Sequence, residues 1–150
     1  MQLFILRHGH AEHFARSDAE RALSERGKQE VHSVVQRHEV ELAKLGQIYV
    51  SPYTRAQQTA AVVSDYFPDI PLTTLDLLTP GDRPQAVINF LSQQDENSHL
   101  LLVSHQPLVT YLVADLCDVP ANSVGMHTAA LASITLNPLL QGKGELQYID

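Results

Sequence analysis

Short apolar runs recur along the chain, each bounded by polar or turn-forming residues. Residues 3–6, 48–50 and 100–103 are wholly apolar, which is typical of strands buried on both faces of a parallel sheet. A further strand is predicted near residues 70–75, although Pro71 interrupts it. These runs predict the strands of a buried central sheet.

Between these runs, apolar residues recur at helical spacing. The longest predicted helix begins at Leu23 and Ser24, with Ser24 as its N-cap, and runs to about Leu45, where Gly46 would end it. Other helices are predicted from Pro52 to Phe67, from Arg83 to about Gln93 behind an Asp82 N-cap, and from Leu108 to Cys117. The polar residues 10–22 are predicted to form a loop long enough to fold over a site.

Two stretches near the end of the chain instead alternate apolar and polar residues. Residues 131–136 and 145–149 follow this pattern with Gly142 and Gly144 between them, which favours an antiparallel edge pair. Strands that alternate with helices indicate an α/β protein, so we predict a three-layer α/β/α sandwich with a mostly parallel central sheet. The chain shows no internal repeat or linker-like segment, and residues 1–150 are predicted to form a single domain.

Composition narrows the class of partner. The net charge of −7 argues against nucleic acid as a partner, because a protein that binds the phosphate backbone is normally basic. Cys117 is the single cysteine, so no internal disulfide can form, which fits a reducing compartment. The first apolar run is too short for a signal peptide, and no stretch reaches membrane-spanning length. We expect a cytoplasmic monomer that binds neither nucleic acid nor membrane.

Residues that can do chemistry follow three of the predicted strands. Arg7, His8 and Gly9 come directly after the first strand, Arg55 lies just after the second, and His105 follows the strand at residues 100–103. Because ligands of such sheets bind beyond the carboxyl ends of the strands, these side chains are predicted to meet at one edge.

The chemistry of this group favours an anion. Two arginines offer planar forks of donors, and two histidines offer a nucleophile, base or ligand. Arg55 falls in the first turn of its helix, where a cation is disfavoured by roughly 0.3–1 kcal/mol unless an anion is bound nearby. Pro107 places a helix N-terminus behind His105, which also suits an anion. Taken one at a time, these residues could equally be a polar strand end, a surface arginine and a capping histidine. Together they predict a cradle for a phosphoryl group.

Several motifs in order along the chain resemble those of one family. They are Arg7-His8-Gly9, Leu23-Ser24-Glu25-Arg26-Gly27, residues 51–59 from Ser51 to Thr59, and Ser104-His105-Gln106-Pro107. They resemble the motifs of the histidine phosphatase superfamily, and the short chain is similar to the SixA-type phosphohistidine phosphatases. The resemblance runs from Met1 to about Leu136. It implies the histidine phosphatase, or phosphoglycerate mutase-like, fold.

Carried over by position, the resemblance assigns catalytic roles. It makes His8 the nucleophile, which would be phosphorylated transiently and then released by water. It implies that Arg7, Arg55 and His105 hold the phosphoryl oxygens and stabilise charge in the transition state. Such a reaction depends mainly on positioning and charge stabilisation.

The resemblance also implies weaker substrate contacts from Arg21 on the loop and from Gly9, and it implies no cofactor and no metal. A metal site built on His8, His10 and His13 is the alternative. No cysteine or carboxylate cluster completes a tetrahedral set around them, and the neighbouring arginines would repel a cation.

One feature of the family's sugar-phosphate members is absent. They usually place a carboxylate general acid in the third quarter of the chain, where this sequence offers only Asp76 and Asp82. An alkoxide leaving group needs a proton, whereas a phosphorylated imidazole that is already protonated leaves as neutral imidazole. The missing acid therefore favours a P–N substrate. Only 50 positions separate Arg55 from His105, which leaves no room for a cap subdomain and favours a phosphate carried on another protein.

The leading hypothesis is thus a protein phosphohistidine phosphatase. It would hydrolyse the P–N bond of phosphohistidine on a phosphorelay or phosphotransfer carrier, either a histidine phosphotransfer (HPt) domain or a phosphotransfer protein, through a phospho-His8 intermediate. The alternatives are a small-molecule phosphomonoesterase of the same superfamily and a non-catalytic phosphohistidine-binding module.

Overall fold

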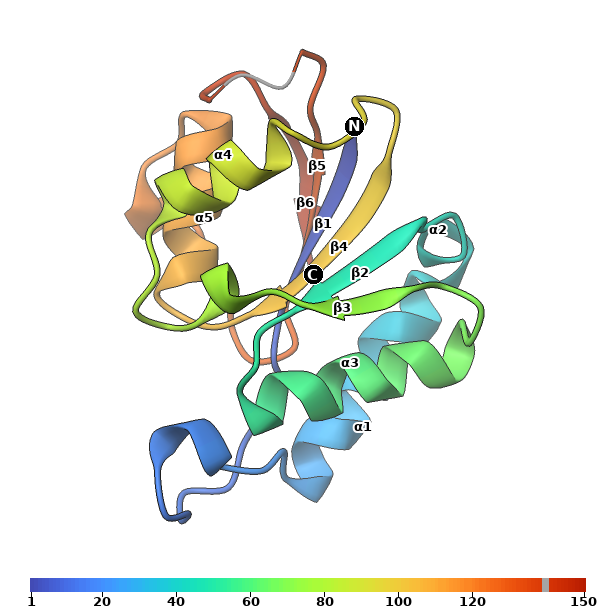
Figure 1. The fold of residues 1–150 in the computed structure, drawn as a ribbon, viewed down its shortest axis with the longest axis vertical. Helices are drawn as coiled ribbons and strands as arrows, with labels where there is room; N and C mark the ends of the chain where they lie inside the picture. The colour runs from blue at the N-terminus through green and yellow to red at the C-terminus, as the bar shows by residue number, and fades with distance from the viewer. Residues whose placement is uncertain (139–140) are drawn as a thin grey trace.

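A six-stranded sheet forms the middle layer of the computed structural model, which describes residues 1–138 and 141–150 (Figure 1). Its spatial order is β3-β2-β4-β1-β5-β6. The strands are β1 (Gln2–Arg7), β2 (Gln47–Val50), β3 (Leu72–Thr74), β4 (His99–Ser104), β5 (Leu131–Thr135) and β6 (Glu145–Ile149). The four strands from β3 to β1 are parallel, while β5 runs antiparallel to β1 and β6 antiparallel to β5. The mostly parallel sheet and the antiparallel final pair are as predicted.

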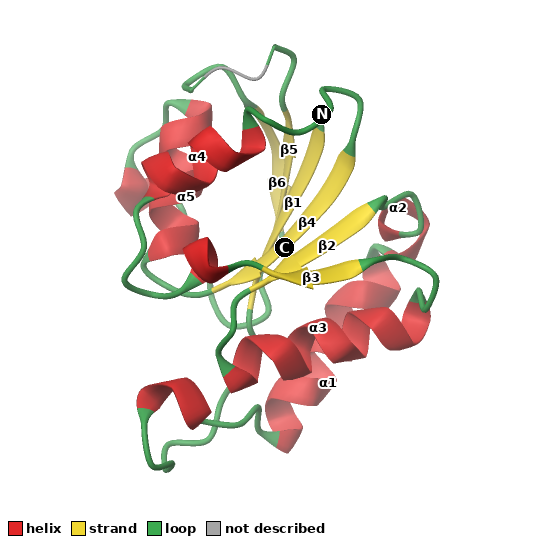
Figure 2. Cartoon of the chain, viewed as in Figure 1, coloured by secondary structure: helices red, strands yellow, loops and turns green. Residues whose placement is uncertain are grey.

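Helices cover both faces of this sheet, which confirms the predicted α/β sandwich (Figure 2). The helices are α1 (Glu25–Arg37), α2 (Glu39–Leu42), α3 (Thr54–Tyr66), α4 (Pro84–Leu91) and α5 (Leu108–Cys117). Short 3₁₀ turns lie at Asp18–Glu20, Asp76–Leu78 and Ala121–Ser123. Figure 1 shows α4 and α5 on one face of the sheet and α1 and α3 on the other. No helix among the described residues is long and apolar enough to cross a bilayer.

Strand β1 divides the core into two halves. Its Leu3 and Ile5 pack with residues of α4 and α5, whereas Phe4 and Leu6 pack with residues of α1 and α3. Alternate side chains of a strand point to opposite faces, and in β1 both faces are buried. Burial of both faces explains why this strand is a continuous apolar run in the sequence.

Two local predictions are wrong. The helix expected to run to Leu45 breaks at His38, whose backbone leaves the helical region (φ −116°, ψ 19°). The His38 ring stacks on Tyr148 at 4.7 Å and its Nε2 lies 2.7 Å from the Asp150 carboxylate, so the end of the chain holds this residue. Asp82 does not cap α4. Its carboxylate instead accepts hydrogen bonds from the backbone and side chain of Thr79.

Candidate active site

The carboxyl ends of β1 and β4 lie side by side and carry the two histidines. Arg7 pairs in register with Ser104, and the His8 amide continues the ladder by donating to the Ser104 carbonyl at 3.0 Å. The rings of His8 and His105, the next residues along, have centroids 5.0 Å apart. Arg55, in the first turn of α3, reaches the same point from beyond β2. The structure therefore brings together the residues that the sequence placed at one edge of the sheet.

The His8 imidazole is held as the neutral ring with its proton on Nδ1. Nδ1 lies 2.7 Å from the Gly9 carbonyl oxygen, which can only accept, so Nδ1 donates. Nε2 then keeps a lone pair and accepts from Arg55 Nε at 3.3 Å. Burial lowers the pKa of His8 to about 4, with further lowering by the charges of Arg55 and Arg7, against the opposing effect of the Gly9 hydrogen bond. At neutral pH this ring carries an unprotonated nitrogen beside a guanidinium.

His105 is also neutral and is 1% exposed. Burial, followed by the neighbouring His8 and Arg55, lowers its pKa to about 3. Its Nε2 hydrogen-bonds the Ser51 hydroxyl at 2.7 Å, while its Nδ1 is buried with no hydrogen-bond partner among the described residues. A buried polar atom left unpaired costs about 1–3 kcal/mol, and a catalytic role is one reason for a fold to keep such an atom.

Arg7 lies beside His8 and is anchored from the far side of the site. Its Nη1 donates to the Met126 carbonyl at 3.0 Å, and its Nε is buried without a partner among the described residues. Burial lowers the pKa of Arg7, partly offset by the charge of Glu30. A guanidinium stays protonated at any working pH, so Arg7 is a fixed positive charge next to the nucleophilic candidate.

Arg55 is the most constrained of the site cations, with 4% of its side chain exposed. Its Nη1 donates to the Asp18 carbonyl at 2.6 Å and its Nη2 to the Asp18 carboxylate at 3.1 Å. The same carboxylate accepts from Arg21 Nε at 3.0 Å. Arg21, predicted as a contact from the loop, thus joins the site through Asp18, and its charge contributes to the lowered pKa of His8.

Gly9 has a structural reason to be glycine. A Cβ built there would lie 2.5 Å from the Gly27 carbonyl oxygen in the first turn of α1. The Gly9 amide donates to the Thr59 hydroxyl at 3.2 Å, and that hydroxyl donates to the Arg55 carbonyl at 2.8 Å. The turn after β1 is therefore packed directly against α1 and tied to α3, the helix that carries Arg55.

His10 turns away from the histidine pair. Its Nδ1 lies 2.7 Å from the hydroxyl of Ser24, which caps α1 by accepting from the Gly27 amide at 3.0 Å. Within the described residues, no three His, Cys, Asp or Glu side chains are grouped to hold a metal ion.

Sequence reasoning missed the supporting groups. Ser51 and Thr59 lie inside the motif that begins at Ser51, but their spacing gives no sign that they contact His105 and Gly9. Glu30 bridges the His10 amide and the Thr128 hydroxyl through its two carboxylate oxygens. Asp18 stands three residues before Arg21, a spacing that could have suggested an ion pair on a turn.

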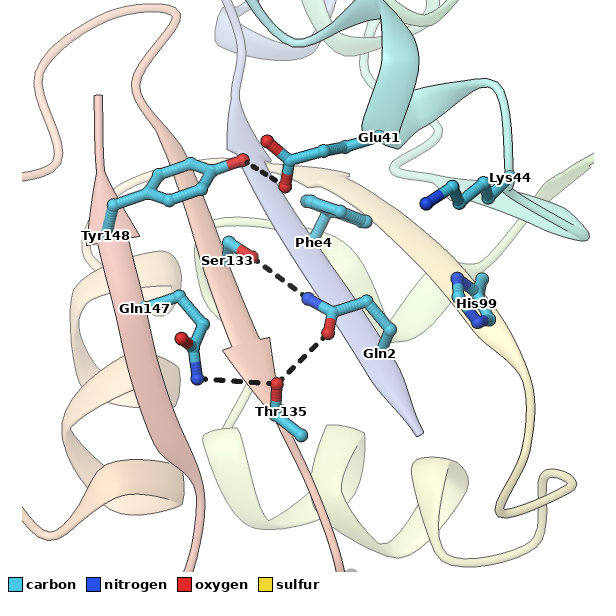
Figure 3. Close-up of a pocket in the computed structure, with 9 residues that line it drawn as sticks. All are labelled: Gln2, Phe4, Glu41, Lys44, His99, Ser133, Thr135, Gln147 and Tyr148. Atoms are coloured by element: carbon cyan, nitrogen blue, oxygen red, sulfur yellow. Dashed lines mark hydrogen bonds between the residues drawn. The ribbon is translucent and has the colours of Figure 1, made fainter.

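A separate cleft of about 460 Å³ lies elsewhere on the sheet and includes none of the site residues (Figure 3). Several of its polar groups pair with one another, since Gln2 donates to Ser133 at 2.9 Å and accepts from Thr135 at 3.1 Å. The Tyr148 hydroxyl likewise donates to Glu41 at 3.1 Å. None of the arginines or histidines at the carboxyl edge of the sheet lines this cleft, so it is separate from the histidine pair.

A neutral imidazole beside one buried and one half-buried guanidinium, at the carboxyl edge of an α/β sheet, is the arrangement expected of a phosphoryl-transfer site. The family model described as "Histidine phosphatase superfamily (branch 1)" matches residues 3–79. The chain belongs to this superfamily.

Within the superfamily the chain is similar to proteins of the SixA type. It is 38% identical to "Phosphohistidine phosphatase SixA" of Escherichia coli (strain K12), over 91% of this chain and 86% of that one. It is 34% identical to the SixA homolog of Haemophilus influenzae (strain ATCC 51907 / DSM 11121 / KW20 / Rd), over 89% and 87%. The solved structure of the protein histidine phosphatase SixA complexed with tungstate superposes with a TM-score of 0.88 at 34% identity, covering 99% of this chain and 96% of that one.

Proposed function

We propose that this chain is a protein phosphohistidine phosphatase that works through a phospho-His8 intermediate. The observation that carries the proposal is the state of His8: Nδ1 donates to the Gly9 carbonyl, and the unprotonated Nε2 accepts from Arg55 Nε at 3.3 Å. The names of the relatives above 30% identity support the choice of phosphohistidine as substrate.

The first step transfers the phosphoryl group to His8. The Nε2 lone pair gives up its hydrogen bond from Arg55 Nε and attacks phosphorus, the P–N bond of the substrate breaks, and its electron pair returns to the carrier's imidazole. That imidazole leaves neutral when its other nitrogen carries a proton. Arg7, Arg55 and His105 are proposed to hold the phosphoryl oxygens, because fixed cations and dipoles stabilise the charge that develops in the transition state.

The second step hydrolyses the phosphohistidine on the protein. Water attacks phosphorus, the Nε2–P bond breaks, and the electron pair returns to His8 while orthophosphate keeps the protons of the water. Because Nδ1 already holds a proton toward the Gly9 carbonyl, His8 departs as neutral imidazole without an external acid. The geometry that makes Nε2 a nucleophile therefore also makes it a leaving group.

Two features support a phosphohistidine carrier protein as the substrate. Asp82 is engaged by Thr79, Asp76 is exposed at the start of a 3₁₀ turn, and neither carboxylate hydrogen-bonds a described residue of the site. The segment between Arg55 and His105 is filled by α3, β3, α4 and β4, without a cap over the site. We infer a phosphorelay or phosphotransfer carrier, such as an HPt domain, as the phosphohistidine donor.

The remaining parts of the proposal concern the setting. Arg21 and Gly9 are proposed as secondary substrate contacts, and neither a cofactor nor a metal is needed in the steps above. We propose that residues 1–150 act as one domain and as a monomer. The single Cys117, which has no cysteine to pair with, suits a reducing compartment, and the cytoplasm is the proposed location.

Labelled phosphate provides the test. The wild-type chain is incubated with a ³²P-phosphohistidine carrier, quenched in alkali and assayed for label on the chain and for released phosphate. We expect transient label on His8 and multiple turnovers, whereas His8→Ala should lose at least about 10³-fold in rate and trap no label. The exposed His32→Ala is the matched control and should behave as wild type.

An alkyl phosphate assayed in parallel separates the alternatives. Faster turnover of the alkyl ester than of the carrier would point to a small-molecule phosphomonoesterase. Binding of the carrier without label or phosphate release would point to a non-catalytic reader. Wild-type rates in His8→Ala would remove His8 from the nucleophile role.

A further inference from the structure

Asp18 contacts two arginines of the site, Arg55 and Arg21, through its carboxylate and its backbone carbonyl. It begins the 3₁₀ turn Asp18–Glu20 in the segment between β1 and α1. One carboxylate oxygen accepts from Arg55 Nη2 at 3.1 Å and the other from Arg21 Nε at 3.0 Å. Its backbone carbonyl accepts from Arg55 Nη1 at 2.6 Å. An exposed loop residue thus accepts hydrogen bonds from both Nη atoms of a buried guanidinium.

These contacts fix the direction of the third nitrogen of Arg55. A guanidinium is planar and rigid, so two fixed Nη atoms determine where Nε–H points. In this structure Nε–H points at His8 Nε2, 3.3 Å away. The Arg55 side chain has several rotatable bonds, and without the Asp18 contacts it would have to find this orientation at each turnover.

We propose that Asp18 is a positioning residue, which holds Arg55 so that its Nε–H faces the nitrogen that receives the phosphoryl group. The proposal rests on the proposed function of the site. Asp18 need not touch the substrate, since its effect passes through Arg55. Its position on the loop also means that the loop between β1 and α1 sets the geometry of the transfer step.

The same contacts could have a competing role, and the two roles predict opposite effects of removing Asp18. If the Asp18 carboxylate merely occupied the place of a phosphate on Arg55, its removal would free the guanidinium and tighten anion binding. If Asp18 orients Arg55, its removal weakens the reaction. The contact from the Asp18 backbone carbonyl favours the orienting role. A phosphate could displace the Asp18 carboxylate from Arg55, but the carbonyl would still hold Arg55 Nη1.

The loop has attachments independent of Asp18, so variants at this position should fold. The Glu12 amide donates to the Ala22 carbonyl at 2.8 Å, and Ala11 bridges to Leu23. The Leu23 amide donates to the Gln58 side chain at 2.7 Å. The carboxylate of Asp18 itself is 59% exposed, so its loss leaves no buried void.

The kinetic test compares Asp18→Asn and Asp18→Ala with Glu20→Gln, an exposed acid in the same 3₁₀ turn. With a ³²P-phosphohistidine carrier, we expect both Asp18 variants to lower kcat about tenfold or more with KM changed less than about threefold, and Glu20→Gln to match wild type. In an Arg55→Ala background, Asp18→Asn should have little further effect, because contacting residues that act as one unit are not additive. Asp18→Glu should recover part of the rate.

Nuclear magnetic resonance gives a readout that does not depend on turnover. The Arg55 Nε–H resonance, assigned by its loss in Arg55→Lys, should be sharp in wild type and Glu20→Gln and broadened or shifted in Asp18→Asn. An inactive wild type with this spectral change would overturn the proposed function while upholding the orientation of Arg55. An unchanged spectrum and kcat, additivity with Arg55→Ala, or tighter inhibition by orthophosphate in Asp18→Asn would each overturn the positioning role.

Discussion

Two neutral imidazoles with centroids 5.0 Å apart are the chemical centre of this site. Burial and nearby guanidinium groups both favour loss of the ring proton, which lowers the pKa of His8 to about 4 and of His105 to about 3. A free histidine is protonated in part at neutral pH and would be a poorer nucleophile. The arginines therefore keep the proposed nucleophile unprotonated before any phosphate arrives, and the same charges would attract the phosphate.

The lowered pKa of His8 sets the acid limit of activity. Protonation of Nε2 removes the nucleophile, so kcat/KM should be level down to about pH 5 and should fall below about pH 4. The pH profile of kcat/KM reports the free enzyme, and it can be measured with a labelled carrier after subtracting loss of label without enzyme. An acid limb near pH 6.5 would mean that His8 titrates like an exposed imidazole and would contradict this prediction.

At the scale of single residues, the sequence was informative where charged or imidazole side chains directly follow a buried strand. Arg7, His8 and His105 stand out because charged and imidazole side chains are unusual directly after apolar runs. Asp18 and Ser51 do not stand out, since both residue types are ordinary in turns. Their function depends on which arginine or histidine the fold places beside them, and local sequence does not contain that information.

At the scale of elements, the turn after β1 packs tightly against the start of α1. Gly27 lies in the first turn of α1, and a Cβ there would be 2.0 Å from the His10 carbonyl oxygen and 2.8 Å from the His10 amide nitrogen. Both neighbours are backbone atoms that cannot move without shifting the turn. Two glycines, Gly9 and Gly27, thus allow α1 to pack against the turn that carries His8.

Gly27→Ala tests this contact. Helix propensity alone predicts stabilisation by about 1 kcal/mol. The clash opposes it, and overpacking typically costs about 1–3 kcal/mol, so we expect a net loss of up to about 2 kcal/mol in the free energy of unfolding. Urea denaturation measures this loss. Gly46→Ala is the control, because its Cβ would meet nothing nearer than the His99 carbonyl oxygen at 3.8 Å. A more stable Gly27→Ala would show that the contact relaxes freely.

Helix positions were predicted better than helix ends. The apolar spacing found α5 over its full length, but α1 stops at Arg37 because His38 contacts Tyr148 and Asp150 at the other end of the chain. Asp82 has the residue type of an N-cap, yet the turn at Thr79 takes its carboxylate. Both errors have one cause, which is a competing partner that only the folded chain supplies.

At the scale of the whole molecule, the site exists because of strand order. The sequence predicted that several strand ends share an edge, but not that β4 lies between β1 and β2. That order places His105, after β4, beside His8, after β1, while Arg55 reaches His8 from beyond β2. Parallel pairing depends on contacts between residues far apart in the chain, and apolar runs of similar composition do not specify their neighbours.

Because His8 and His105 are buried as neutral rings, the stability of the whole fold should decrease in acid. Both have a folded-state pKa below the ordinary value of 6.5, so between about pH 6.5 and pH 4 the unfolded chain binds more protons than the folded chain. The free energy of unfolding then rises with pH across this window and falls on acidification, by up to about 1.4 kcal/mol per pH unit for each histidine.

Urea denaturation at intervals from pH 7 to pH 4 measures this slope. In the double variant His8→Asn with His105→Asn the slope should flatten, because those two proton-binding groups no longer differ between states. The exposed His32→Asn should keep the wild-type slope. Burial raises the pKa of Asp18, but the hydrogen bonds and charges of Arg55 and Arg21 together lower it below the ordinary value of 3.8, so Asp18 loses its contribution mainly below pH 3.8, at the acid end of this range. A slope unchanged in the double variant would mean that other groups govern acid unfolding and that the histidine pair is not held neutral by the fold.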